Sequence, residues 1–195
     1  MTLILTYHAI EEGPAPLCID PPLFAEHVAV IADSGADILT VSELAEALAS
    51  GRLPECAVAI TFDDGCASVV EHATPVLDAH GLRATVFAVA GRVGGANDWP
   101  TQASWVPPLR LATGEQLAGL VGRGWEVGSH GVDHAPLDHL DEAAARREIV
   151  ESRHLLEDMV GVVVTAFAWP YGAHPSAAVA ALIESTYGEI GRAHV

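Results

Sequence analysis

Six short apolar runs alternate with helix-like segments along the whole chain, and this alternation constrains the fold more than any other feature. Each run has the length and apolar content of a buried strand. The predicted strands span residues 3–7, 38–39, 57–61, 85–89, 125–128 and 166–169. Strands that alternate with helices in this way indicate a parallel sheet covered by helices, which is the α/β class.

Start and stop signals place a helix after each predicted strand. Thr40 with Glu43 has the spacing of a capping box, and Thr113 with Gln116 opens another helix. The predicted helices span residues 21–34, 41–50, 68–80, 113–124, 141–159 and 175–185. Residues 91–111 are rich in glycine, proline and tryptophan, so we expect a long loop that acts as a lid or faces the substrate.

The polar residues that follow the strands favour a barrel over an open sheet. The pairs Asp63–Asp64, Ser129–His130 and Pro170–Tyr171 follow different predicted strands, and His8 follows the first one. The carboxyl ends of all strands of a (β/α) barrel meet on one face, where active sites are built. The G-x-G-x-x-G fingerprint of dinucleotide-binding open sheets is absent. We therefore predict a barrel.

Composition limits the partners and the compartment. A chain of 195 residues, 50% of them hydrophobic, has the size of a single domain. Its net charge of −17 argues against nucleic acid and anionic membranes as partners. Three cysteines without a C-x-x-C pair fit a reducing compartment. Neither a signal peptide nor a membrane span is recognisable, so we expect a cytoplasmic protein, or a cell-envelope or extracellular one if further sequence precedes Met1.

Two short motifs carry the candidate chemistry. "TFDDG" places Asp63 and Asp64 after a buried strand, where a helix N-cap would be the structural alternative. "GSHGVDH" places His130 and His134 four residues apart after another strand, which chance alone could also produce among ten histidines. Two imidazoles and one carboxylate form a three-ligand set for Zn²⁺ that leaves a fourth position open. One aspartate can then bind the metal while the other acts as general base.

"TFDDG", "SHGVDH" and "FAWPYG", in this order, resemble the NodB-homology polysaccharide deacetylases of carbohydrate esterase family 4. "LTYHAI" and its spacing to "TFDDG" resemble the poly-N-acetylglucosamine deacetylase subgroup. The resemblance implies a distorted (β/α) barrel with fewer than eight regular strands. It also implies Asp63 as catalytic base, and Asp64, His130 and His134 as ligands of a divalent metal, with zinc expected. Gly131 stands where the family motif carries a hydroxyl residue.

The resemblance also indicates where this chain departs from the family. Tyr171 is expected to stabilise an oxyanion through its backbone N–H. The family's late Leu-x-His-like motif, which supplies a general acid, has no match after Ser185, and His194 lacks a strand context. We therefore expect a single domain over residues 1–195 that lacks its C-terminal element and leaves an open seam beside the first strand. His8 is the alternative general acid.

The function expected from these features is a metal-dependent hydrolase that removes acetyl groups from N-acetylated amino sugars of a glycan. A catalytically impaired glycan-binding domain is one alternative, favoured by the absent late motif. A deacylase of a small N-acyl or O-acetyl substrate is another. A phosphoesterase with two metals fits less well, because the motifs supply too few carboxylates. Trp99 and Trp105 are candidates either for stacking on sugar rings or for anchoring the loop. The sequence does not predict an oligomeric state.

Overall fold

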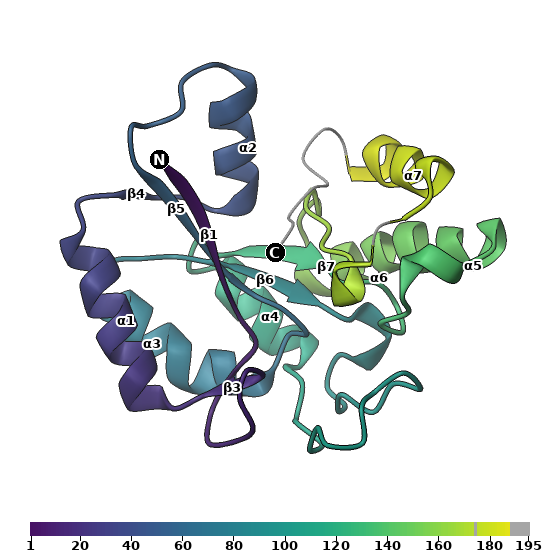
Figure 1. Ribbon diagram of the computed structural model, residues 1–195, viewed down its shortest axis with the longest axis horizontal. Helices are drawn as coiled ribbons and strands as arrows, with labels where there is room; N and C mark the ends of the chain where they lie inside the picture. The colour runs from purple at the N-terminus through teal and green to yellow at the C-terminus, as the bar shows by residue number, and fades with distance from the viewer. Residues whose placement is uncertain (174, 188–195) are drawn as a thin grey trace.

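The computed structural model describes residues 1–173 and 175–187, and it confirms the α/β class (Figure 1). His194 lies outside the described residues. Five predicted strands form one parallel sheet, and two shorter strands pair within the loop after the first. The sheet order is β1 (Thr2–Tyr7), β5 (Ala57–Phe62), β6 (Thr85–Ala88) and β7 (Glu126–Ser129), with β4 (Asp37–Ile38) beside the start of β5; the short pair is β2 (Ala9–Ile10) and β3 (Cys18–Ile19).

The sixth predicted strand, at residues 166–169, is wrong as a strand. It is reduced to a parallel bridge between Ser129 and Phe167. The Ser129 N–H donates to the Ala166 carbonyl, and the Ala168 N–H donates to the Ser129 carbonyl, both at 2.9 Å. Pairing ends there because Pro170 has no N–H and begins the 3₁₀ turn η5 (Pro170–Gly172). Among the described residues this segment and β1 form the two edges of the sheet.

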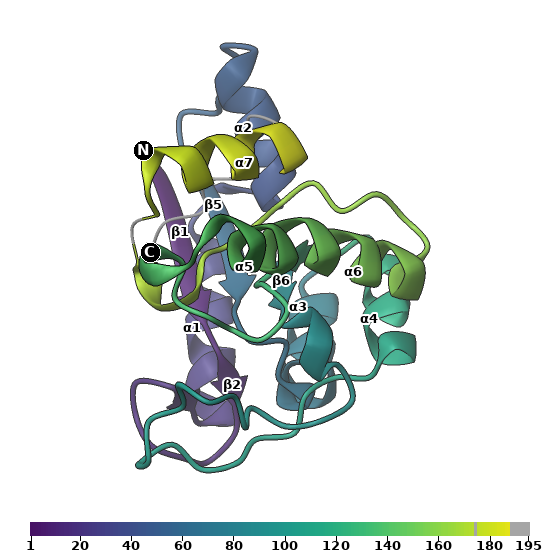
Figure 2. The same cartoon turned by 90° about the vertical axis from the view of Figure 1, so that its right-hand side faces the viewer.

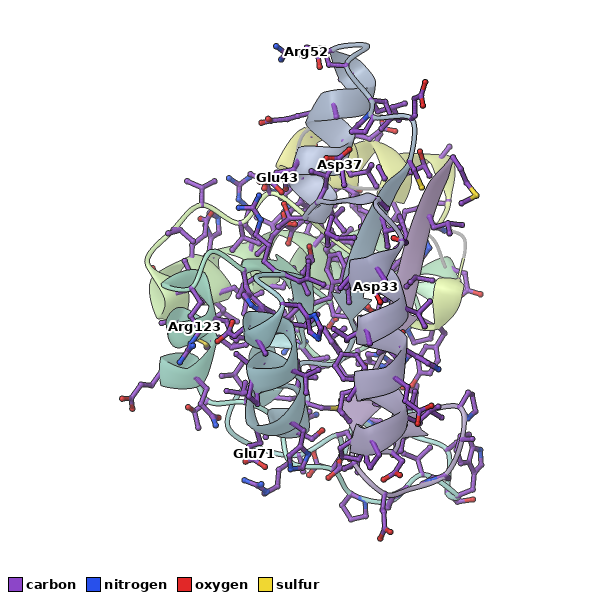
Figure 3. The ribbon with its side chains drawn as sticks, turned by 90° about the vertical axis from the view of Figure 1, so that its left-hand side faces the viewer. Asp33, Asp37, Glu43, Arg52, Glu71 and Arg123 are labelled. Atoms are coloured by element: carbon purple, nitrogen blue, oxygen red, sulfur yellow. The ribbon has the colours of Figure 1, made fainter. Side chains whose placement is uncertain are left out.

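Helices cover the outside of the sheet, and α1, α3 and α4 lie side by side there (Figure 3). The α-helices are α1 (Pro21–Asp33), α2 (Val41–Ala49), α3 (Thr74–Ala79), α4 (Gly114–Val121), α5 (Glu142–Arg146), α6 (Ser152–Val160) and α7 (Ala177–Tyr187). Both expected capping pairs, Thr40 with Glu43 and Thr113 with Gln116, form capping boxes. Charged side chains such as Asp33, Glu71 and Arg123 project from the outer surface (Figure 3).

Two predicted long helices each contain a π turn. The helix expected at 68–80 begins with η1 (Val69–Ala73) before α3, and the one expected at 141–159 holds η4 (Arg147–Glu151) between α5 and α6. Each π turn inserts an extra residue into a helix and rotates the side chains that follow, and such turns are frequent at functional sites. The remaining 3₁₀ turns are η2 (Ala90–Arg92) and η3 (Leu137–His139). No helix among the described residues is long and apolar enough to cross a membrane.

Successive side chains of a strand point to opposite faces of the sheet, and this alternation divides the hydrophobic core into two clusters. In β5, Val58, Ile60 and Phe62 pack in the cluster that the outer helices share. Ala57 and Ala59 pack instead in a smaller cluster around Phe87, which α2 closes with Val41 and Leu44. Small residues surround the Phe87 ring, and a Cβ at Gly128 would lie 2.6 Å from it. Phe87 therefore fills the interior of a distorted barrel, as the α/β barrel prediction requires.

Candidate active site

The candidate site lies where the strands end. His8 follows β1, Asp63 follows β5, His130 follows β7, and Tyr171 follows the bridge at Phe167. Figure 2 shows the loop after β1 and the loop of residues 91–111 at this end of the sheet. All the predicted catalytic and ligand residues line one cavity of about 360 Å³. The structure thus brings together every site residue that the sequence indicated.

Strand register places His8 beside Asp63. Tyr7 pairs with Phe62 at the end of the β1–β5 ladder, and the Asp63 N–H donates to the Tyr7 carbonyl at 2.9 Å. His8 and Asp63 are the next residues on the two strands. Because alternate residues of a strand share a face, Asp63 continues the inward-facing series of Ala59 and Thr61. Its side chain therefore points into the mouth of the barrel.

Asp64, His130 and His134 form a buried cluster of candidate metal ligands. One ligand atom from each lies within 4.8 Å of the others, and no other such group is found among the described residues. The Asp64 Oδ1 atom lies 3.2 Å from the His134 Nε2 atom and 3.6 Å from the His130 Nε2 atom. All three side chains are almost fully buried. One carboxylate and two imidazoles at these distances suit a divalent cation with an open position.

The protonation of His130 shows that a cation fits this cluster. The Nδ1 atom lies 2.8 Å from the Ala168 carbonyl and must donate to it, since a carbonyl only accepts. Burial, together with the nearby His134, lowers the pKa of His130 to about 3, so its ring is neutral and its Nε2 atom carries a lone pair. That lone pair faces Asp64 Oδ1, which is buried without a well-formed hydrogen bond. Two acceptors that face each other in a dry site need a cation between them.

Aromatic side chains enclose His134. The Trp99 ring stacks on the imidazole with centroids 4.2 Å apart, and the Tyr171 ring meets it edge-on at 4.5 Å. Trp99 is 3% exposed, and its burial against His134 favours the alternative that it anchors the loop. Trp105 also lines the cavity but is 58% exposed, which leaves its ring open to a substrate. The Tyr171 hydroxyl lies 2.9 Å from the Thr101 Oγ1 atom and thereby ties the turn η5 to the long loop.

Backbone strain is concentrated at this site. Among the described residues, the non-glycine residues with positive φ are Asp64 at 68°, His134 at 57° and Tyr171 at 60°. Left-handed backbone at such residues costs on the order of 1–3 kcal/mol each and tends to gather at functional sites. The sequence gives only a weak signal for this strain. Gly65 and Gly172, which follow Asp64 and Tyr171, indicate turns but do not show which residue is strained.

The charges of the cavity suit proton transfer. Burial, and secondarily the Asp64 carboxylate, raises the pKa of Asp63 to about 8. Burial lowers the pKa of His8, while the negative charge of Asp64 acts in the opposite direction. Two titratable groups on neighbouring strands therefore have pKa values moved from their ordinary ranges by the same desolvated cavity. Groups perturbed in this way are typical of acid–base sites.

Comparison with known proteins agrees with this geometry. The family model described as polysaccharide deacetylase matches residues 50–188, a range that includes both carboxylates and both histidines but not His8. YxkH of Bacillus subtilis is 29% identical over 170 residues, which are 87% of this chain and 56% of that protein. The poly-beta-1,6-N-acetyl-D-glucosamine N-deacetylase of Staphylococcus epidermidis is 29% identical over 146 residues, which are 70% of this chain and 48% of that protein.

The fold has solved counterparts. The structure of IcaB from Ammonifex degensii superposes with a TM-score of 0.78 at 27% identity, over 96% of this chain and 80% of that one. The chain spans about half the length of the two curated relatives named above. The family match covers more than half of the chain and contains the buried ligand cluster together with its neighbouring carboxylate. This chain therefore belongs to the polysaccharide deacetylase family.

Proposed function

We propose that this chain, acting as one domain, is a metal-dependent deacetylase that removes acetyl groups from N-acetylglucosamine residues of a glycan. The observation that carries the proposal is the buried cluster of Asp64, His130 and His134 with a second carboxylate, Asp63, in the same cavity. A domain that only binds glycans has no need of a carboxylate with a raised pKa beside a cation site. Family membership supports the same reaction.

The cation that suits these ligands best is Zn²⁺, because it accepts one carboxylate and two imidazoles and keeps a position open. When bound, such an ion acts as a Lewis acid towards an acyl oxygen and makes water more acidic. The Ala168 carbonyl holds His130 in the tautomer that presents Nε2 to the ion. Trp99, stacked on His134, restricts the rotation of the second imidazole.

The remaining groups divide the proton transfers between them. Asp63 takes the proton of the attacking water as general base. The backbone N–H of Tyr171 donates to the oxygen that becomes negative as the acetyl carbonyl is attacked. His8 returns a proton to the leaving amine as general acid. Its position supports this role, because it follows the strand paired with β5 and lines the same cavity as Asp63.

A glycan rather than a small acylated metabolite is supported by the open side of the cavity. Trp105, 58% exposed, lies at its edge and presents an apolar surface of the kind that packs against sugar rings. A volume of about 360 Å³ is at the small end of ligand pockets, so it accommodates the reacting residue while the rest of a polymer lies outside. The Staphylococcus epidermidis relative is described as acting on a β-1,6-linked N-acetylglucosamine polymer, so this polymer is the first substrate to test.

Acetate release from a β-1,6-linked N-acetylglucosamine oligomer, with Zn²⁺ present, tests the proposal. We expect Asp63→Asn to lower the rate by about 10² or more while the oligomer still binds. Asp37→Asn is the matched control, because this exposed aspartate in β4 is distant from the cavity. An acetylated xylan and the monosaccharide serve as alternative substrates. Oligomer binding without acetate release from any substrate would contradict the proposal and favour a glycan-binding domain.

A further inference from the structure

Glu148 is a buried carboxylate outside the candidate ligand cluster. It lies in the π turn η4 and is 3% exposed, although its neighbours in sequence include four other charged residues. A buried carboxylate must accept hydrogen bonds or be paired, because desolvating its charge is otherwise unfavourable. Its partners therefore indicate what it does.

Those partners are the backbone of the loop between the two histidine ligands. The Glu148 Oε2 atom accepts from the Val132 N–H at 2.8 Å and from the Asp133 N–H at 3.0 Å. The Oε1 atom accepts from the same Asp133 N–H at 3.2 Å and lies 3.6 Å from the Arg147 Nη1 atom. One carboxylate thus holds the two central peptide groups of the segment that joins His130 to His134.

Gly131 is shaped to admit this carboxylate. Its φ of +84° is left-handed, and a Cβ built on it would lie 2.6 Å from the Glu148 Oε2 atom. A hydroxyl side chain at this position, as in the motif that the sequence resembles, would collide with the carboxylate in this backbone conformation. The position of the Glu148 carboxylate therefore depends on the absence of a side chain at Gly131.

Hydrogen bonds also hold the backbone of Glu148 itself, in the π turn η4. The Ser152 Oγ atom donates to the Glu148 carbonyl at 2.6 Å and lies 2.8 Å from the Ser129 Oγ atom. The Ser129 Oγ atom in turn accepts from the Gly131 N–H at 3.3 Å. The end of β7, the loop and η4 are therefore joined by continuous hydrogen bonds, and those made by Ser129, Ser152 and the Val132 N–H are buried.

We infer that Glu148 is a positioning residue that sets the separation and orientation of His130 and His134 through the backbone of Val132 and Asp133. The inference rests on the proposed metal site. The left-handed backbone of His134 needs support from its surroundings, and the anchored peptides immediately before it supply that support. Without the carboxylate, the loop gains conformations in which the two imidazoles do not meet at one point.

The test is the affinity of the protein for Zn²⁺, measured by competition with a chromophoric chelator, together with the melting temperature of the metal-free protein. Removing an outer partner of a metal ligand typically costs 10–100-fold in affinity. We expect Glu148→Ala to weaken zinc binding by about 100-fold and Glu148→Gln by about 10-fold, since the amide oxygen keeps one acceptor. Gly131→Ala, which forces the carboxylate away, should weaken zinc binding as well.

Glu126→Gln is the matched control. The Glu126 carboxylate also accepts several hydrogen bonds, from the Ser42 N–H and from the Thr85 hydroxyl, but at the opposite end of the sheet. It should lower the melting temperature and leave zinc affinity unchanged. Zinc binding by both Glu148 variants within twofold of the parent protein would overturn the inference, as would an equal loss in Glu126→Gln. If the parent protein itself binds no zinc, the proposed metal site fails and the inference fails with it.

Discussion

Replacing Asp63 with asparagine should stabilise the metal-free protein even as it removes the proposed base. Burial and the adjacent Asp64 raise the pKa of Asp63 from 3.8 to about 8. An acid whose pKa is raised in the folded state contributes stability at low pH, and this contribution is lost as pH rises from about 4 through about 8. At pH 7 the ionisation of Asp63 in the unfolded chain therefore favours unfolding.

The size of this effect follows from the two pKa values. While the folded protein keeps the Asp63 proton, each pH unit above 3.8 lowers the free energy of unfolding by about 1.4 kcal/mol. This penalty amounts to about 4 kcal/mol at pH 7 and about 2 kcal/mol at pH 5. Asparagine does not titrate and escapes the penalty. For a chain of this length, we expect the wild-type melting temperature to fall about 5–10 °C more than that of Asp63→Asn between pH 5 and pH 7.

Thermal unfolding in the presence of a chelator measures this difference. Asp37→Asn, which changes an exposed carboxylate in β4, should keep the wild-type pH dependence. Added Zn²⁺ should reduce the difference between wild type and Asp63→Asn, because a cation held by Asp64 offsets the repulsion between the two carboxylates. Equal pH dependence of wild type and Asp63→Asn without metal would refute the assignment of Asp63 as a desolvated carboxylate.

Three further results are expected. His130→Ala combined with His134→Ala should abolish zinc retention in elemental analysis, and stoichiometric zinc in that variant would contradict the ligand assignment. Trp105→Ala should raise KM for an oligosaccharide several-fold and leave kcat intact, because the ring is exposed at the cavity edge; an unchanged KM would remove it from the binding surface. Burial raises the pKa of Tyr187 to about 12, so stability should be lost as pH rises from about 10 to 12. In denaturant titrations between pH 10 and pH 12, Tyr187→Phe should lose about 3 kcal/mol less unfolding free energy than the wild type. An identical loss in both proteins would contradict the raised pKa of Tyr187.

The sequence predicted the parts of the molecule that depend on local pattern. Apolar runs located β1, β5, β6 and β7, and residues just past their ends marked the cavity. The prediction failed for residues 166–169, whose apolar character reflects burial beside β7 and whose pairing stops at a proline. An apolar run indicates that a segment is buried. Whether the segment also forms a full set of β-sheet hydrogen bonds depends on the strand that packs beside it.

The finer geometry of the site depended on long-range contacts that no local pattern carries. Trp99 and Trp105 share one loop and look alike in sequence, yet one lies beneath His134 and the other faces solvent. Glu148 reads as part of a charged helix surface, and only the return of that helix to the end of β7 buries it. His8 was placed at the right end of the sheet, but its pairing beside Asp63 required the β1–β5 register.

Phe87 links the shape of the cavity to the stability of the fold. Its ring packs in the smaller core cluster and also forms part of the cavity wall. Truncating the ring to alanine would deepen the cavity, but it would remove a core side chain at a cost of about 3–5 kcal/mol, a large fraction of the stability of a typical domain. Enlarging the cavity on this side therefore requires compensating stabilisation elsewhere in the core.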